Sequence, residues 1–166
     1  MRKQFAKTLL ELAKKDKRIV TLIGDVSYSE LEEFRKLFPD RFYNMGLCEQ
    51  TIIGISGGLA INGLRPIVHS ITPFILERAF EQIKIDIDES NLPIILMGYD
   101  DYPTYGFTHR ALNVEKTIDI FKNIKGFYPK NNYETEKALL DAYLLKIPAF
   151  IWLKKDSIPF VPKGDI

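Results

Sequence analysis

The chain has 166 residues, of which 23 are basic and 22 acidic, so its formal net charge is +1. This balance leaves no basic surface that would follow a phosphate backbone, so nucleic-acid binding is not expected. A hydrophobic content of 46% is enough for the core of one domain, and without a long apolar run neither a membrane span nor a secretory signal is predicted. Cys48 is the only cysteine and the two histidines are far apart, which argues against disulfides and against a zinc or iron site and favours the cytoplasm.

The first half of the chain is predicted to alternate helices with short strands. Apolar residues recur with helical spacing over residues 5–13, and a buried strand is expected at 19–23. A second helix at 31–38 ends at a proline and leads to a brief extended segment at 41–44. Residues 51–61 keep the period of a helix despite their glycines, because Asn62 and Gly63 provide a stop signal only after them.

The second half continues the alternation. We predict a strand at 65–70, one long helix at 73–88 and a strand at 93–98 that is apolar enough to be buried on both faces. A loop rich in glycine and tyrosine follows at 99–109. The remaining predicted elements are a helix at 114–123, a strand at 126–128, a helix at 133–145 and a strand at 149–153.

This alternation predicts an α/β fold of three layers, with a mostly parallel sheet of about six strands and helices on both faces. One domain is expected over residues 1–156, followed by a tail at 157–166. Ligands of such sheets bind beyond the carboxyl ends of the strands. The segments expected at that edge are 24–29, 44–49, 70–74 and 99–109.

Glu49 is the strongest candidate for a functional residue. It lies where an extended segment passes into an apolar, glycine-rich helix, with few polar neighbours in the sequence. A carboxylic acid in apolar surroundings can share a proton with a bound base, which would suit acid–base work. The simpler interpretation is that Glu49 opens a helix, whose dipole favours a negative charge at that end. Burial would favour the protonated form and the helix end the ionised form, so its protonation state stays open.

Other motifs carry weaker signals. Gly54, Gly57 and Gly58 fall inside a predicted helix, so close helix packing explains them better than a phosphate-binding loop. His69 ends a strand and is either a satisfied polar group or a functional one. His109 lies in the loop expected at the carboxyl edge of the sheet, where ligands bind, and this position favours a catalytic role over that of an ordinary surface histidine. Phe74 is either a core residue or a ring that packs on a ligand.

Four motifs stand out in order along the chain. They are residues 38–50 (Phe-Pro-Asp-Arg-Phe-Tyr-Asn-Met-Gly-Leu-Cys-Glu-Gln), residues 58–60 with Gly63 and Pro66, residues 78–83 (Arg-Ala-Phe-Glu-Gln-Ile) and residues 106–109 (Gly-Phe-Thr-His). In this order they resemble the pyrimidine-binding domain of transketolases and deoxyxylulose-phosphate synthases, and the resemblance covers nearly the whole chain.

The resemblance implies half of a site for thiamine diphosphate. In that family the glutamate matching Glu49 hydrogen-bonds the cofactor's aminopyrimidine and favours the imino tautomer that activates the thiazolium carbon. Phe74 matches an aromatic residue that packs on the pyrimidine, and Ile71 stands at the neighbouring position, where an aromatic residue is usual. Asp25 is predicted to contact the cofactor as well. His109 matches a histidine that contacts the substrate, which makes Glu49 and His109 the predicted catalytic residues.

The departures from the family pattern concern the substrates. Tyr105 replaces an acidic residue that reads the donor's hydroxyl in transketolase, and Arg110 stands where glutamine is common. Ordinary ketose-phosphate donors are therefore in doubt. Arg2, Ser29 and Lys155 fall near positions where the family holds sugar phosphate, and together with His109 and Tyr105 they complete the predicted substrate-binding set.

The resemblance also implies a partner. The family's diphosphate-binding domain, with its Gly-Asp-Gly motif and Mg²⁺ ligands, has no match in this sequence, and neither has the third domain. We therefore expect a partner subunit that holds the diphosphate and Mg²⁺, in a heterotetramer of two copies of each chain. The helix containing Gly54 and Ala60 is a predicted interface.

Three functions remain possible at this point. The first is a transketolase-like subunit that transfers a two-carbon ketol or acyl unit from a keto donor to an aldehyde sugar. The second is a subunit of a 2-keto acid decarboxylase or carboligase. The third is a non-catalytic regulatory module of the same fold, against which the retained Glu49 and His109 argue, because a buried acid costs stability.

Overall fold

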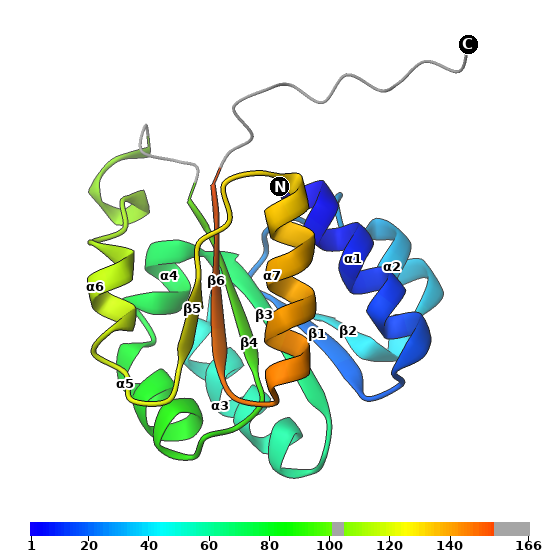
Figure 1. Ribbon diagram of the computed structural model, residues 1–166, viewed down its shortest axis with the longest axis horizontal. Helices are drawn as coiled ribbons and strands as arrows, with labels where there is room; N and C mark the ends of the chain where they lie inside the picture. Colours follow the sequence, from blue (N-terminus) through cyan, green and yellow to red (C-terminus); the bar gives the residue numbers. More distant parts are fainter. Residues whose placement is uncertain (101–104, 155–166) are drawn as a thin grey trace.

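A computed structural model describes residues 1–100 and 105–154 of the chain. A six-stranded parallel sheet in the order β2-β1-β3-β4-β6-β5 forms its centre (Figure 1). The strands are β1 (Ile19–Ile23), β2 (Phe42–Asn44), β3 (Arg65–Ile71), β4 (Ile95–Asp100), β5 (Lys125–Phe127) and β6 (Ala149–Lys154). The predicted α/β class with about six parallel strands is confirmed.

Helices cover both faces of the sheet. The α-helices are α1 (Arg2–Lys15), α2 (Glu32–Leu37), α3 (Glu49–Ile61), α4 (Thr72–Leu76), α5 (Phe80–Gln82), α6 (Val114–Ile118) and α7 (Asn132–Leu145). The 3-10 helices are η1 (Pro39–Arg41) and η4 (Phe107–His109), and η2 (Ile83–Glu89) is a π-helix. Figure 1 shows α1 and α7 side by side over one face, with α3 and α4 on the other.

Two hydrophobic cores result from the alternation of side chains along each strand. In β1, Ile19 and Ile23 join the core beneath α1, α2 and α7, whereas Val20 and Leu22 join the core beneath α3, α4 and α6. All five residues of β1 are buried, as expected for a strand with helices on both sides. The sheet is therefore a rigid support for whatever projects from its carboxyl ends.

The prediction of one long helix at 73–88 is wrong. The chain there forms α4, α5 and the π-helix η2, with a break around residues 77–79. The Pro73 carbonyl accepts from the backbone N–H groups of both Glu77 and Arg78, so the helix widens where it would have continued. The break directs the Arg78 side chain toward α3.

The helix predicted at 114–123 is also too long, because α6 ends at Ile118. The buried Asp88 accounts for the difference. Its carboxylate accepts hydrogen bonds from the backbone N–H groups of Lys122, Asn123 and Ile124, at 2.7 to 3.1 Å. These N–H groups are thus taken out of the helical pattern and turned toward β5.

The glycines of α3 are packed in part as predicted. A Cβ on Gly57 would lie 3.4 Å from the Asp86 carbonyl oxygen, and one on Gly54 would lie 3.7 Å from the Asp86 carboxylate, so η2 approaches α3 closely there. A Cβ on Gly58 would meet nothing within 4 Å. Close packing against the residues that the structure describes therefore does not explain Gly58.

The predicted tail at 157–166 lies outside the described residues. Within 1–100 and 105–154, the helices are too short or too polar to cross a membrane.

Candidate functional site

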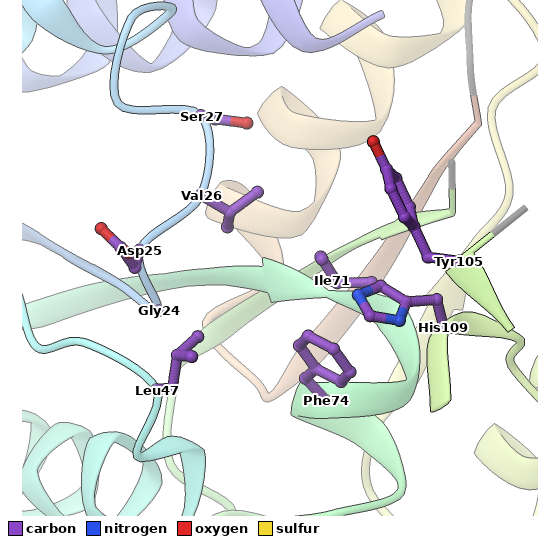
Figure 2. Close-up of a pocket in the computed structure, with 9 residues that line it drawn as sticks. All are labelled: Gly24, Asp25, Val26, Ser27, Leu47, Ile71, Phe74, Tyr105 and His109. Carbon is purple, nitrogen blue, oxygen red and sulfur yellow. The ribbon is translucent and has the colours of Figure 1, made fainter. Parts of the chain in front are cut away.

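A cavity of about 350 Å³ lies beyond the carboxyl ends of the strands. It is lined by Gly24, Asp25, Val26, Ser27, Leu47, Ile71, Phe74, Tyr105 and His109 (Figure 2). Each of the four segments predicted to meet at this edge contributes at least one of these residues. The lining residues come from segments up to 85 positions apart, from Gly24 to His109. They meet because the carboxyl ends of the parallel strands lie at the same edge of the sheet.

One wall of the cavity is the loop of residues 24–27, which follows β1. Asp25 and Ser27 both have positive φ angles, 54° and 55°, which residues other than glycine rarely adopt. Asn44 holds this conformation, because its Oδ1 accepts from the Asp25 and Gly46 backbone N–H groups, each at 3.1 Å, and its Nδ2 donates to Asp25 Oδ1 at 2.9 Å. Strained backbone held by neighbours is typical of ligand sites.

The facing wall is aromatic. Figure 2 shows Tyr105 and His109 opposite the loop of residues 24–27, with Phe74 and Ile71 beside them. The His109 ring lies edge-on to Phe74 with 4.9 Å between ring centroids, and 5.4 Å separates it from Tyr105. Thr108 Oγ1 lies 3.0 Å from His109 Nδ1. This wall can hold a flat ring against Phe74 and present an imidazole to a bound molecule.

Glu49 is the first residue of α3, and its side chain is 1% exposed. It lies directly behind Gly24, because a Cβ on that glycine would come within 3.1 Å of Glu49 Oε1. The expectation of few polar neighbours is wrong. Ser70 Oγ donates to Oε1 at 3.0 Å and Arg78 Nη1 donates to Oε2 at 2.8 Å. The buried carboxylate is therefore compensated by an ion pair and a hydroxyl.

Arg78 links this acid to the aromatic wall. While one nitrogen of its guanidinium binds Glu49, its Cζ lies 4.1 Å from the centre of the Phe74 ring. The stacking holds the guanidinium in place, and the ion pair fixes the direction of the Glu49 carboxylate. The positions of Glu49 and Phe74 are thus coupled through one cation.

His69 is a satisfied core residue, which settles the alternative that the sequence left open. Its Nδ1 lies 3.1 Å from the Met97 carbonyl oxygen, which can only accept, so Nδ1 carries the proton. Nε2, 2.7 Å from Ser27 Oγ, then accepts the Ser27 hydroxyl proton. Burial lowers the pKa of His69 to about 4, so the ring is neutral at neutral pH.

Of the predicted sugar-phosphate residues, Arg2 lies behind the cavity wall. Arg2 reaches Ser27, a lining residue, with Nη1 3.4 Å from its Oγ. Ser29 does not line the cavity and donates to Glu30 Oε2 at 2.8 Å. Lys155 lies outside the described residues. The structure therefore brings Asp25, Ile71, Phe74, Tyr105 and His109 together around the cavity, with Glu49 behind Gly24 and Arg2 behind Ser27.

Sequence reasoning missed four residues of this region: Ser70, Arg78, Asn44 and Glu30. Ser70 and Arg78 contact Glu49 from 21 and 29 positions away, so no local pattern could reveal these contacts. A signal for Arg78 existed in the motif at residues 78–83, and one for Asn44 existed at the end of a predicted strand. Among the described residues, no group of three or more acidic, histidine or cysteine side chains is arranged to hold a metal ion.

Comparisons with known proteins agree with this arrangement. The family described as "Transketolase, pyrimidine binding domain" matches residues 1–160. A relative from Phocaeicola vulgatus, named as one subunit of an apulose-4-phosphate transketolase, is 31% identical over 99% of this chain and 54% of its own length. A 1-deoxy-D-xylulose-5-phosphate synthase from Aquifex aeolicus is 40% identical over 61% of this chain and 17% of its own length.

A solved structure titled "Split gene transketolase, inactive beta4 tetramer" superposes with a TM-score of 0.85 at 28% identity, covering 99% of this chain and 54% of that one. The chain thus spans about half the length of the apulose-4-phosphate transketolase subunits and of the split-gene chain. Since the family matches almost every residue, the chain belongs to the family of the transketolase pyrimidine-binding domain.

Proposed function

We propose that this chain is a subunit of a two-chain, thiamine diphosphate-dependent, transketolase-like enzyme. It supplies the aminopyrimidine half of the cofactor site, and the enzyme transfers a two-carbon ketol or acyl unit from a keto donor to an aldehyde acceptor. The observation that carries the proposal is the buried carboxylate of Glu49 behind the glycine wall of an aromatic cavity, at the carboxyl end of the parallel sheet.

The described residues fit the aminopyrimidine of the cofactor. That ring needs a flat apolar surface and an acceptor for a ring N–H, and Phe74 and Glu49 are residues of these types on adjacent elements. Gly24 leaves Glu49 without a Cβ between it and the cavity. Thiamine diphosphate, when bound, supplies a nucleophilic carbon that attacks the keto donor and then stores its electrons.

Several side chains in and behind the cavity have a proposed part. Glu49 holds a proton between its carboxylate and the ring nitrogen, and Ser70 and Arg78 keep that carboxylate in one orientation. Phe74 and Ile71 provide the apolar contact for the ring, and Asp25 bounds it on the opposite side. His109 and Tyr105 face the substrate, where His109 can donate or accept a proton as the carbonyl group changes charge.

The diphosphate and its Mg²⁺ are proposed to be held by a partner subunit with a Gly-Asp-Gly motif. In support, the described part of this chain offers no cluster of metal ligands, and the relative from Phocaeicola vulgatus is named as one subunit of its enzyme. A heterotetramer of two copies of each subunit is the proposed assembly. The exposed side of α3, with Thr51, Ile55 and Gly58, is the proposed interface.

Cofactor binding tests the two-chain proposal. The isolated chain should bind thiamine diphosphate weakly in the presence of Mg²⁺, because its described residues contact only the pyrimidine end. Addition of the purified partner should lower the dissociation constant by at least about a hundredfold, since a second set of contacts then acts on the same ligand. Isothermal titration calorimetry measures both values. Equally tight binding by the isolated chain would contradict the proposed division of the site.

Replacement of Glu49 tests its proposed role. In the assembled enzyme, Glu49→Gln should slow exchange of the cofactor's C2 proton by about a hundredfold or more, because an amide cannot shuttle the proton between itself and the ring. Quenched-flow NMR of the exchange gives the rate. The matched control is Glu81→Gln, an exposed glutamate on α5, which should leave exchange unchanged. Normal exchange in Glu49→Gln would remove Glu49 from the mechanism.

A further inference from the structure

We propose that Glu30 makes this site selective for substrates without a phosphate group. Glu30 pairs with Arg2, the arginine behind the Ser27 wall of the cavity, and so neutralises the charge that an anionic substrate would need there. The inference rests on the proposed function, because it names the class of substrate for the same cavity: a hydroxylated, unphosphorylated keto or aldehyde compound.

The Glu30 carboxylate occupies two groups that could otherwise bind an anion. Its Oε1 lies 3.4 Å from Arg2 Nη2, and its Oε2 accepts the Ser29 hydroxyl proton at 2.8 Å. The side chain of Glu30 is 14% exposed and that of Arg2 is 24% exposed, so water screens the pair only in part. Arg2 and Ser29, two of the residues for which the resemblance implied a sugar-phosphate contact, are therefore engaged with a carboxylate of this chain.

Arg2 is also held from its other sides. Its Cζ lies 4.1 Å from the centre of the Tyr99 ring, and its Nη1 lies 3.4 Å from Ser27 Oγ. A guanidinium that stacks on a ring and contacts a carboxylate and a hydroxyl would lose these contacts if it turned toward a substrate. The charge of Arg2 is thus fixed at the wall.

The charges of this cluster discriminate between two kinds of substrate. Arg2 and Glu30 cancel, and His69, which shares Ser27 with Arg2, is neutral at neutral pH. Within this cluster of described residues, no net positive charge compensates the repulsion between Glu30 and a phosphate dianion in the cavity. An uncharged hydroxyl group meets no such repulsion.

The Arg78–Glu49 pair follows the same pattern on the other side of the cavity. Arg78 stacks on Phe74, a lining residue, and its charge is matched by a carboxylate that is 1% exposed. Neither of these two arginines therefore contributes a net positive charge to the cavity. This balance is unlike the surroundings in which phosphate groups are bound, where arginines and lysines outnumber acids.

Titration with inorganic phosphate tests the inference on the full chain. Glu30→Gln should bind phosphate at least about tenfold more tightly than the unsubstituted chain, because Arg2 then lacks an anionic partner. NMR titration of the backbone amides of residues 27–30, or calorimetry, measures the change. Glu33→Gln, which removes the same charge from an exposed position on α2, is the matched control and should bind phosphate as weakly as the unsubstituted chain.

Three results would overturn the inference. These are equal phosphate affinity of the unsubstituted chain and Glu30→Gln, an equal gain in Glu33→Gln, and a gain in Glu30→Gln that persists when Arg2→Met is added. Circular dichroism and thermal unfolding establish that each variant is folded.

In the assembled enzyme, Glu30→Gln should raise the ratio of kcat/KM for a ketose phosphate over that for the matching unphosphorylated ketose by at least about tenfold. An unchanged ratio with measurable turnover would also contradict the inference. If no variant shows activity that depends on thiamine diphosphate, the proposed function fails. The phosphate titration still reports on Arg2 and Glu30 in that case, so the two failures are distinguishable.

Discussion

At the scale of single residues, His69 links the hydrogen bonding of Ser27, a residue of the cavity wall, to pH. The imidazole is fully buried, donates to the Met97 carbonyl oxygen and accepts from Ser27, so protonation would place an unpaired charge in the core. Protonation would also reverse the Ser27 hydrogen bond, because Nε2 would then donate and the Ser27 hydroxyl would accept. The loop of residues 24–27 thus contacts a histidine whose neutral form matches its present hydrogen bonds.

Its pKa determines how stability changes with pH. Burial lowers the pKa of His69 to about 4, below the usual 6.5, so between these values the unfolded chain binds more protons than the folded chain. The free energy of unfolding should therefore fall as the pH drops from 6.5 to 4, by up to about 3 kcal/mol from this residue. Urea unfolding at pH 7, 6, 5 and 4 measures the change. His69→Gln should flatten this dependence, and an identical slope in the variant would contradict the assignment.

At the scale of elements, α3 carries both the buried acid and a side that residues 1–100 and 105–154 leave exposed. Gly54 and Gly57 face the Asp86 region of η2, whereas a Cβ on Gly58 would meet nothing within 4 Å. A glycine in the middle of a helix costs stability when it packs against nothing. Gly58 therefore lowers the stability of the isolated chain, and none of the described residues makes a contact that accounts for its presence.

Substitution of Gly58 separates stability from assembly. Gly58→Ala should raise the free energy of unfolding of the isolated chain by about 0.5 to 1 kcal/mol, because alanine is the better helix former. Chemical unfolding measures this gain. If the exposed side of α3 is the proposed interface, the same variant should weaken association with the partner subunit, which analytical ultracentrifugation detects. A loss of stability in the isolated chain would show that Gly58 is packed.

Most elements could be predicted from the sequence because their signals are local. The run at residues 19–23 is apolar throughout except for Thr21, and β1 has those same bounds. The edge of the sheet that holds the cavity followed from the parallel order alone. By contrast, the end of α6 depends on a distant residue, because Asp88 binds backbone N–H groups more than 30 positions away.

The candidate site shows the same limit. The positions of Phe74, Asp25 and His109 around the cavity could be predicted, since each lies near the end of a strand in the sequence. The surroundings of Glu49 could not, because its partner Arg78 reaches it only through the break that follows Pro73. Likewise, the contact between Glu30 and Arg2 joins α1 to the segment before α2, and β1 lies between them in the chain.

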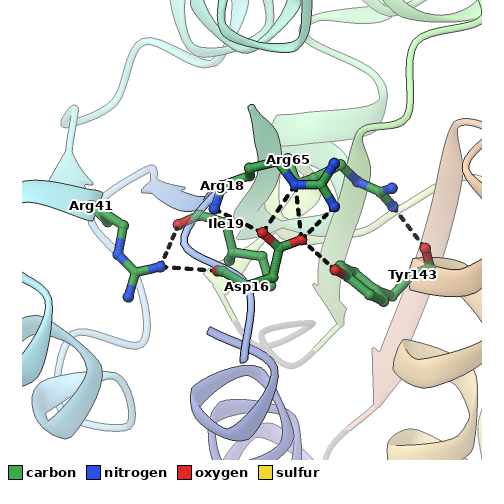
Figure 3. A network of polar contacts seen from close by, with 6 residues as sticks. All are labelled: Asp16, Arg18, Ile19, Arg41, Arg65 and Tyr143. Atoms are coloured by element: carbon green, nitrogen blue, oxygen red, sulfur yellow. Dashed lines mark hydrogen bonds and ion pairs between the residues drawn. The ribbon is translucent and has the colours of Figure 1, made fainter. Parts of the chain in front are cut away.

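At the scale of the whole molecule, the sheet has the cavity at its carboxyl end and a polar network at its amino end. The amino ends of β1 and β3 carry a polar network of Asp16, Arg18, Arg41, Arg65 and Tyr143 (Figure 3). Arg18 donates to both carboxylate oxygens of Asp16, at 3.0 and 2.8 Å, and the Tyr143 hydroxyl donates to the same carboxylate. Arg41 binds backbone carbonyl groups of Ala13 and Asp16, so the network ties α1, α7 and the sheet together.

Because β1 is about 16 Å long at the usual rise per residue, this network is remote from the cavity. Asp16→Asn should lower the free energy of unfolding by about 1 to 3 kcal/mol, since Arg18 and Tyr143 lose a charged acceptor. Cofactor binding by the assembled enzyme should stay unchanged, and calorimetry checks that. A parallel loss of cofactor affinity would show that the two ends of the sheet are coupled.

The pH dependence of this effect has a definite sign. The hydrogen bond from Arg18 holds the pKa of Asp16 well below its usual value of 3.8, so its stabilising effect is complete above that pH and is lost on further acidification. The difference in stability between the unsubstituted chain and Asp16→Asn should therefore shrink below pH 4.

The two outermost strands of the sheet, β2 and β5, have three residues each. A border strand of that length leaves few unpaired N–H and C=O groups along its open side, too few to template another chain. The molecule should consequently resist fibril growth by strand addition, even though its central strands are largely apolar.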